Sequence, residues 1–150
     1  MISWQRVTFE QLTTTQLYQV LKLRVDVFVV EQHCPYPDLD GKDCMADVHH
    51  LLGYEDDELV AYARLLPKNM SYSSISIGRV TTAKTHRGGG LGHELIQQAL
   101  AECQDLWPSE DIEIGAQAHL ESYYSQHGFQ RTSDPYLEDG IPHIDMKLHR

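Results

Sequence analysis

Three consecutive glycines, in the segment Arg87-Gly88-Gly89-Gly90-Leu91-Gly92, separate a strand-like stretch over residues 75–82 from a helix-like stretch over residues 91–106. Adjacent glycines allow neighbouring backbone N–H groups to face one side, because glycine tolerates backbone angles that other residues avoid. The start of a helix adds unpaired N–H donors and the positive end of its dipole. Residues 87–92 are therefore predicted to cradle a diphosphate group.

The spacing of this segment, Arg-x-x-Gly-x-Gly, indicates which diphosphate fits. A dinucleotide-binding turn has the spacing Gly-x-Gly-x-x-Gly, but His93 stands where the last glycine of that motif belongs. The segment does not match Gly-x-x-x-x-Gly-Lys-Ser/Thr either. The diphosphate of coenzyme A is the better candidate.

Apolar periodicity predicts the elements around this loop. Strands are expected over residues 2–9, 50–54, 59–66, 75–82, 112–118 and 143–148, and helices from a cap at residues 13–15 to about residue 30, over 91–106 and over 120–127. The strands at 50–54 and 59–66 form a hairpin. Gly128 is expected just after the last helix, in the position that favours a left-handed residue. Without repeats or linkers, residues 1–150 are interpreted as a single domain.

The strand over residues 75–82 changes face along its length. Ile75 and Ile77 put its apolar side on odd positions, whereas Val80 and Thr82 continue it on even positions. A shift of one residue is what a β-bulge produces, here near Gly78-Arg79. The bulge would release backbone N–H and C=O groups that can bind an extended ligand.

Composition limits the class of protein. No apolar run approaches the roughly 18 residues that a membrane helix needs, and the first twenty residues contain no long apolar block. The three cysteines, Cys34, Cys44 and Cys103, fit a reducing compartment better than a disulfide framework. We expect a soluble cytoplasmic protein with no secretory signal and no membrane association.

The net charge of −10 argues against binding to nucleic acid, because lysines and arginines must neutralise phosphates there. Residues 31–58 hold nine acids and one base, Lys42. These acids either solvate loops and a turn, which is the favoured interpretation, or steer a cationic substrate. Residues 31–47 lack periodicity and are expected to form a loop that shapes an entrance. Arg24, on the apolar face of the first helix, is expected to pair with a nearby acid such as Glu31 or Asp26.

Two motifs resemble those of the GNAT N-acetyltransferase superfamily. The first is Ile77-Gly78-Arg79-Val80-Thr81 leading to residues 87–92, and the second is Tyr123-Tyr124-Ser125-Gln126-His127-Gly128-Phe129, which is similar to the family's Tyr-x-x-x-Gly-Phe. Residues 27–32, 59–64, 115–119 and 138–143 resemble the ElaA-like subgroup in particular. The resemblance covers nearly the whole chain. It implies an α/β fold with a mixed, mostly antiparallel sheet, a central bulged strand and helices on both faces.

The resemblance also implies acetyl-CoA as cosubstrate and direct transfer of its acetyl group to a primary amine of a small molecule or a peptide. The residues expected to bind it are Arg79, Val80, Thr81, Thr82, Arg87, Gly88, Gly89, Gly90, Leu91, Gly92, Gln117 and Tyr124. Gln117 departs from the asparagine that many members have at this position, but keeps the amide. The Val80 N–H is the candidate for stabilising the developing oxyanion.

The resemblance suggests the acid, and residue chemistry suggests candidates for the base. Tyr124 is the candidate acid for the departing thiolate, since a tyrosine stays protonated at neutral pH. Its neighbour Tyr123 is expected to point elsewhere, toward the core or the acceptor pocket. An ammonium acceptor must lose a proton before it attacks. Glu113 and His50 are put forward for the base, with His119 and His143 as further candidates, and the choice is open.

Two other interpretations compete with catalysis. Cys34, Cys44, His49 and His50, with His33 nearby, have the residue types of a zinc site, but no Cys-x-x-Cys or i, i+4 histidine pair, so no metal is expected. A non-catalytic acyl-CoA sensor or interaction module would keep the cradle without turnover. The acceptor and the oligomeric state are open, with a homodimer as one alternative.

Overall fold

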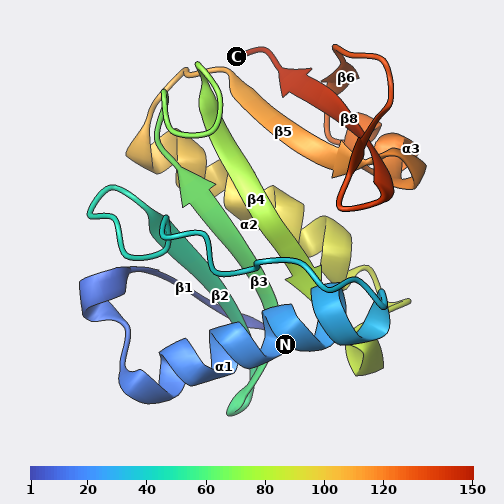
Figure 1. Ribbon diagram of the computed structural model, residues 1–150. Helices are drawn as coiled ribbons and strands as arrows, with labels where there is room; N and C mark the ends of the chain where they lie inside the picture. Colours follow the sequence, from blue (N-terminus) through green and yellow to red (C-terminus); the bar gives the residue numbers. More distant parts are fainter.

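The computed structural model describes residues 1–150 and contains one sheet of eight strands with helices packed on it (Figure 1). The strands are β1 (Ser3–Thr8), β2 (His49–Glu55), β3 (Glu58–Leu66), β4 (Ile75–Thr82), β5 (Ile112–Gln117), β6 (Gln130–Arg131), β7 (Tyr136–Glu138) and β8 (Ile141–Leu148). The α-helices are α1 (Thr14–Arg24), α2 (Leu91–Leu106) and α3 (Glu121–Ser125), and the other helical turns are η1 (Phe9–Gln11), η2 (Val25–Glu31), η3 (Lys84–His86) and η4 (Ala118–Leu120).

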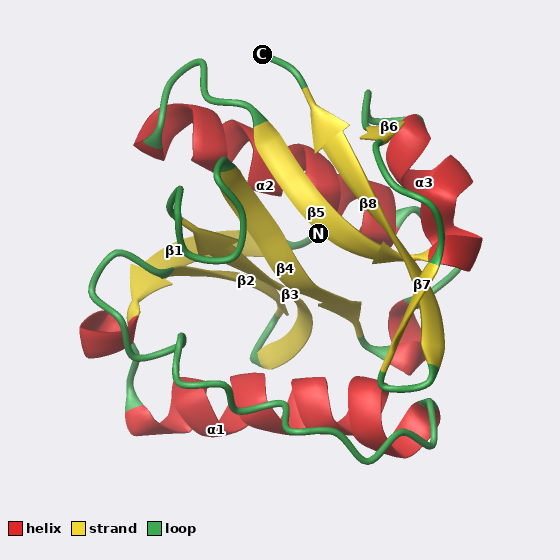
Figure 2. Ribbon diagram, turned by 45° about the horizontal axis from the view of Figure 1, so that its top comes forward, coloured by secondary structure: helices red, strands yellow, loops and turns green.

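The sheet has the order β1-β2-β3-β4-β5-β8-β6, with β7 paired to β8. Every pairing is antiparallel except that of β4 with β5. Helix α1 lies against one face and α2 against the other (Figure 2). The predicted fold class, a mixed and mostly antiparallel sheet with helices on both faces, is confirmed.

Alternation along the strands separates two apolar cores. On one face, Leu51 and Ala63 join the buried side of α2, including Leu95. On the other face, Leu52 and Tyr62 pack against α1 and its continuation. Because neighbouring residues of a strand point to opposite faces, β2 and β3 contribute to both cores and are buried on both sides.

The predicted bulge in β4 is confirmed. Arg64 pairs with Gly78 and Tyr62 pairs with Thr81, so that Arg79 and Val80 together face the single residue Ala63. Arg79 takes a φ of 51°, in the left-handed region. This extra residue disrupts the hydrogen-bond ladder between β3 and β4.

Strands β4 and β5 pair only through Ile75 with Ile112 and Ser76 with Glu113. Figure 1 shows them close together at this end and separating toward the glycine loop. The sheet is therefore open between its two halves, with the bulge on one side of the opening.

Helix α1 begins at a capping box. The Thr13 hydroxyl accepts from the Gln16 N–H at 3.0 Å, and the Gln16 side chain accepts from the Thr13 N–H at 3.0 Å. The helical path continues to Glu31, as predicted, but η2 has the wider π-helical turn. π-Helical turns are rare in proteins, and those that occur often lie at functional sites.

The C-terminal third differs most from expectation. The last helix is limited to α3 after the turn η4, and Gly128 follows it with a φ of 95°, as predicted. The last strand begins at Ile141, and the short strands β6 and β7 are additions, since two or three residues are too few to show an alternating pattern. None of the helices has the length and the apolar character needed to span a bilayer.

Candidate active site

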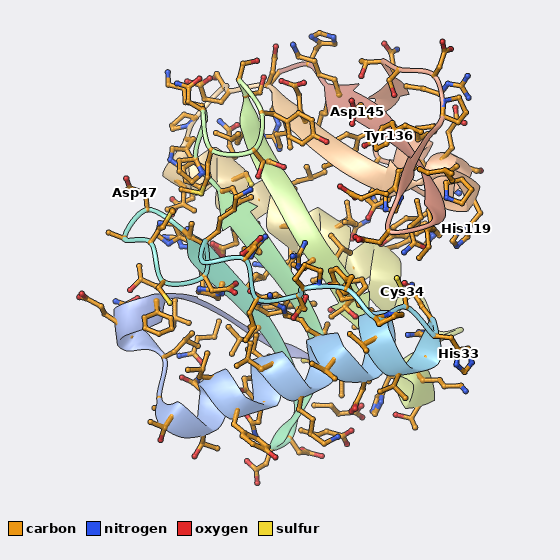
Figure 3. The ribbon with its side chains drawn as sticks, viewed as in Figure 1. His33, Cys34, Asp47, His119, Tyr136 and Asp145 are labelled. Atoms are coloured by element: carbon orange, nitrogen blue, oxygen red, sulfur yellow. The ribbon has the colours of Figure 1, made fainter.

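A cavity of about 470 Å³ occupies the opening between β4 and β5. Its walls come from η2, from the bulge in β4, from the end of β5 with η4 and α3, and from the turn between β7 and β8. Cys34 and His119 both line it, and Figure 3 shows them at the same end of the molecule, from segments far apart in the chain. This volume lies in the usual range for sites that bind small molecules.

The bulge forms one wall. Arg79, Val80, Thr81 and Thr82 all line the cavity. The Thr81 hydroxyl is buried and has no hydrogen-bond partner within the chain. Since buried polar groups are nearly always paired, this oxygen and the interrupted ladder around it can bind polar groups of an extended ligand.

The glycine loop lies next to this wall and exposes its backbone. Gly88 and Gly90 have φ values of 91° and 87°. Gly90 is the N-cap of α2, so no capping side chain accepts from the free N–H groups of the first turn. A Cβ placed on Gly88, Gly89 or Gly90 would meet no atom within 4 Å, so the space beside the loop is open. The backbone N–H of Glu94 donates to the carbonyl of Gly90 and is the first in α2 to form a backbone hydrogen bond. The local geometry is that of an anion site at the start of a 16-residue helix.

Arg87 joins this loop to the opposite wall. Its guanidinium forms an ion pair with Glu31 of η2 and donates to the Thr82 carbonyl at 2.9 Å. The hydrogen bond from Arg87 lowers the pKa of Glu31. The π-helical end of the first helix is thereby held against the end of β4.

Tyr124 lines the cavity from α3 and is 7% exposed. Its hydroxyl forms no hydrogen bond within the chain, and burial raises its pKa, so it stays protonated. Tyr123 donates to the carbonyl of Gly92 in the first turn of α2. The two adjacent tyrosines therefore differ: Tyr123 holds α3 to the start of α2, while Tyr124 lines the cavity with its hydroxyl unpaired.

Gln117 lies at the end of β5, facing the irregular segment after η2. Its side-chain N–H donates to Gln32 Oε1 at 3.1 Å, and both residues line the cavity. The amide that replaces the family's asparagine is thus within the cleft.

Two proposed bases lie elsewhere, which corrects the sequence-based assignment. His50 is 1% exposed in β2, with Nδ1 2.6 Å from the Tyr62 hydroxyl and Nε2 3.0 Å from the Asp43 carbonyl, and burial lowers its pKa. Glu113 lies at the closed end, where it accepts from Ser73 Oγ at 3.2 Å and from the Ser74 N–H at 3.3 Å. The other two candidates, His119 and His143, do line the cavity.

The acidic segment also requires correction, because its central carboxylates neither solvate a loop nor face a substrate. Asp38 and Asp43 are buried and bind the fully buried Arg24 at 3.0 Å and 2.7 Å. Arg64 binds Asp40 at 2.7 Å, and Arg79 of the bulge binds Asp38 at 3.0 Å.

The expected partners of Arg24 were therefore wrong. Asp26 pairs instead with Lys22 at 2.7 Å, and Glu31 with Arg87. The segment folds inward because three arginines on α1, β3 and β4 compensate its charge. In doing so it forms a wall of the cavity, as shown by Tyr36, which lines the cavity beneath the Arg79 guanidinium.

The residues of the zinc interpretation do not converge. Cys34 donates its Sγ–H to the Asp139 carbonyl at 3.4 Å, while Cys44 is exposed. No group of three or more His, Cys, Asp and Glu side chains is placed to hold a metal ion.

These features agree with a known family. Residues 24–150 match the acetyltransferase (GNAT) domain, and the chain belongs to the GNAT acetyltransferase family, within its ElaA-like subgroup. It is 46% identical to Protein ElaA of Escherichia coli K12 over 146 residues, which cover 97% of this chain and 95% of ElaA.

Solved structures give the same assignment. An acyl-CoA N-acyltransferase from Pseudomonas aeruginosa superimposes with a TM-score of 0.94 at 43% identity, covering 99% of each chain. Escherichia coli ElaA superimposes with a TM-score of 0.93 at 44% identity, covering 99% of this chain and 100% of that one. The chain thus has the fold of the GNAT acyltransferases.

Proposed function

We propose that this chain transfers the acetyl group of acetyl-CoA directly to a primary amine of a small acceptor. The observation that carries this proposal is the separation of β4 from β5 after two paired residues, beside a bulge and a glycine loop. An extended thioester can lie in that opening with its two ends held by different parts of the backbone.

The acyl donor is assigned to the glycine loop and to the residues of the bulge and β5 that line the cavity. The diphosphate is proposed to accept from the N–H groups of residues 88–92, where the start of α2 favours negative charge. Arg79, Val80, Thr81 and Thr82 would hold the pantetheine arm, with Gln117 on the opposite strand. The Arg87 guanidinium, at the start of the loop, would also bind the diphosphate. Only the resemblance to the family favours acetyl-CoA over donors with longer acyl chains. The test therefore includes both kinds of donor.

In the proposed reaction the neutral amine attacks the thioester carbon, the carbon–sulfur bond breaks, and no covalent enzyme intermediate forms. The Val80 N–H would stabilise the oxyanion, because a fixed donor needs no reorganisation. The Tyr124 hydroxyl, free and protonated, would supply a proton to the departing sulfur.

The test is a thiol-release assay of the purified chain. Acetyl-CoA and butyryl-CoA are each offered with alkyl diamines, free amino acids, and peptides with a free N-terminus or a lysine. We expect Tyr124→Phe to lower kcat by about 10²-fold or more while keeping the affinity for acetyl-CoA. Tyr18→Phe is the matched control, since Tyr18 is 72% exposed and outside the cavity.

Each other result has a definite meaning. Unchanged turnover in Tyr124→Phe removes this residue from the acid role. Binding of acetyl-CoA without transfer to any amine indicates a sensor instead of an enzyme. Absence of binding contradicts the whole proposal.

We further propose that residues 1–150 act as one catalytic domain in the cytoplasm. One sheet runs through the whole chain, from β1 to β8, and the cavity takes its walls from both halves. All three cysteines are free thiols, which supports a reducing compartment.

A further inference from the structure

His143, the first buried residue of β8, lines the cavity with its ring held from several sides. Nδ1 lies 2.7 Å from the carbonyl oxygen of Ile141. A carbonyl only accepts hydrogen bonds, so the proton of the neutral ring is on Nδ1 and the lone pair is on Nε2. The backbone of β8 thus selects the tautomer in which Nε2 can accept a proton.

Tyr136 fixes the plane of this ring. It is paired with His143 across β7 and β8, and the two rings stack with 24° between their planes and 6.1 Å between their centres. Tyr136 donates to Asp145 Oδ1 at 2.7 Å, and Tyr72 donates to the same oxygen at 2.9 Å. Figure 3 shows Tyr136 and Asp145 near one another beside β8. Because the tyrosine is itself anchored, the imidazole it stacks on has a defined orientation.

Glu138 places a carboxylate beside the free nitrogen of His143. Its Oε2 lies 3.5 Å from His143 Nε2, and its side chain is 60% exposed while that of His143 is 11% exposed. This carboxylate can move toward Nε2 when the ring gains a proton and away from it when an acceptor enters. It is therefore within reach of a hydrogen on Nε2 and leaves the lone pair of the neutral ring accessible.

The position of His143 in the sheet places it beside the donor. On its other side it pairs with Gln117 of β5, which belongs to the proposed pantetheine site. His119, the other histidine of the cavity, is exposed and forms no hydrogen bond within the chain. Of the two rings, only that of His143 is oriented.

We infer that His143 is the general base of the acetyl transfer, with Glu138 and Tyr136 as positioning residues; this inference rests on the proposed function. Nε2 removes one proton from the ammonium acceptor, so that an N–H bond breaks and an Nε2–H bond forms, and the ring later returns this proton to solvent. The neutral amine forms the new C–N bond as the C–S bond breaks. Its second proton reaches the CoA sulfur by way of Tyr124, which ends in its original form.

The test compares His143→Gln with the unmodified chain, using acetyl-CoA and the alkylamine that gives the highest rate in the panel. At about pH 7 we expect kcat to fall by about 10²-fold, with unchanged acetyl-CoA affinity by calorimetry. At about pH 9.5 the loss should shrink to less than tenfold, because solvent then supplies neutral amine. Glu138→Gln should give a smaller loss with the same pH trend.

The pH comparison separates a base from a structural residue. The titratable groups that line the cavity near His143 are Glu138, Asp139, His119 and Cys34, which donates to the Asp139 carbonyl. Tyr136, which binds Asp145, stacks on the His143 ring. Burial and the bond to Asp145 raise the pKa of Tyr136 to about 12, above the range of the assay. His149→Gln, an exposed histidine beside Asp111, is the control and should behave as the unmodified chain.

Equal activity of His143→Gln and the unmodified chain at both pH values overturns the inference while leaving the proposed function intact. A loss that is equal at both pH values also overturns it, since it indicates a structural role. A large pH-dependent loss in His119→Gln instead of His143→Gln moves the base to His119. If the unmodified chain transfers to no amine, the proposed function fails, and the inference with it.

Discussion

The guanidinium of Arg24 and the carboxylate of Asp43 lie 2.7 Å apart in the interior, where no part of the arginine side chain is exposed. Asp43 also binds Arg64 at 3.0 Å, and Arg24 also binds Asp38 at 3.0 Å. These contacts join α1, β3 and the irregular segment into one buried network. This wall of the cavity thus depends on a network of buried charges.

Replacing Arg24 by methionine should therefore destabilise the fold. The change leaves two buried carboxylates with fewer partners, and removal of one member of a buried pair costs about 3–5 kcal/mol. Urea unfolding followed by circular dichroism measures the loss. Lys22→Met removes the exposed pair with Asp26 and should leave the midpoint almost unchanged. Equal effects of the two variants would contradict the buried network.

Acid should loosen the same network over a defined range. Burial alone would raise the pKa of Asp40, but the hydrogen bond and charge of Arg64 outweigh it and lower the pKa to about 2. A carboxyl group with a lowered pKa in the folded state stabilises that state above its unfolded pKa, about 3.9, and loses the contribution as the pH falls toward 2. The free energy of unfolding should decline from about pH 4 downward, and less steeply in Asp40→Asn. Parallel curves for both proteins would show that Asp40 contributes nothing to the decline.

The glycine loop can be tested without disturbing the fold. Gly89 has no positive φ, and a side chain there meets open space, so Gly89→Val should unfold like the unmodified chain. The added methyl groups would cover the N–H donors proposed to bind the diphosphate. We expect acetyl-CoA to bind at least about tenfold more weakly, equivalent to about 1.4 kcal/mol, by calorimetry. Thr15→Val, on the exposed first turn of α1, is the control, and normal binding by Gly89→Val would remove the loop from the donor site.

Local patterns were sufficient for much of the fold. The apolar face of α2, the hairpin of β2 and β3 and the change of face in β4 were all predicted correctly, because each depends on residues near one another in the chain. Tyr124, Gln117 and the bulge residues, which the motifs singled out, all line the cavity. The strands β6 and β7 were missed, since their pairing depends on β8 and not on their own sequence.

The candidates for the general base show what local sequence patterns cannot predict. Alternation gives the face of a strand, but not whether that face meets the cavity or the core. His50 therefore carried the same signal as His143, although one binds Tyr62 in the interior and the other lines the cleft. The signal that distinguishes His143 is its register opposite Gln117 and Tyr136, which depends on two other strands.

Taken alone, the order of residues determined most of the longer elements, the bulge and the glycine-rich start of α2, because backbone preference and apolar period act over a few positions. Only the tertiary structure determined which charged side chains form ion pairs. Asp38 is 14 residues from Arg24 and 41 from Arg79, and only the folding of the irregular segment onto the sheet brings it to both. Ion pairs and proton transfers depend on distances of a few ångströms in space, which separation along the chain does not specify.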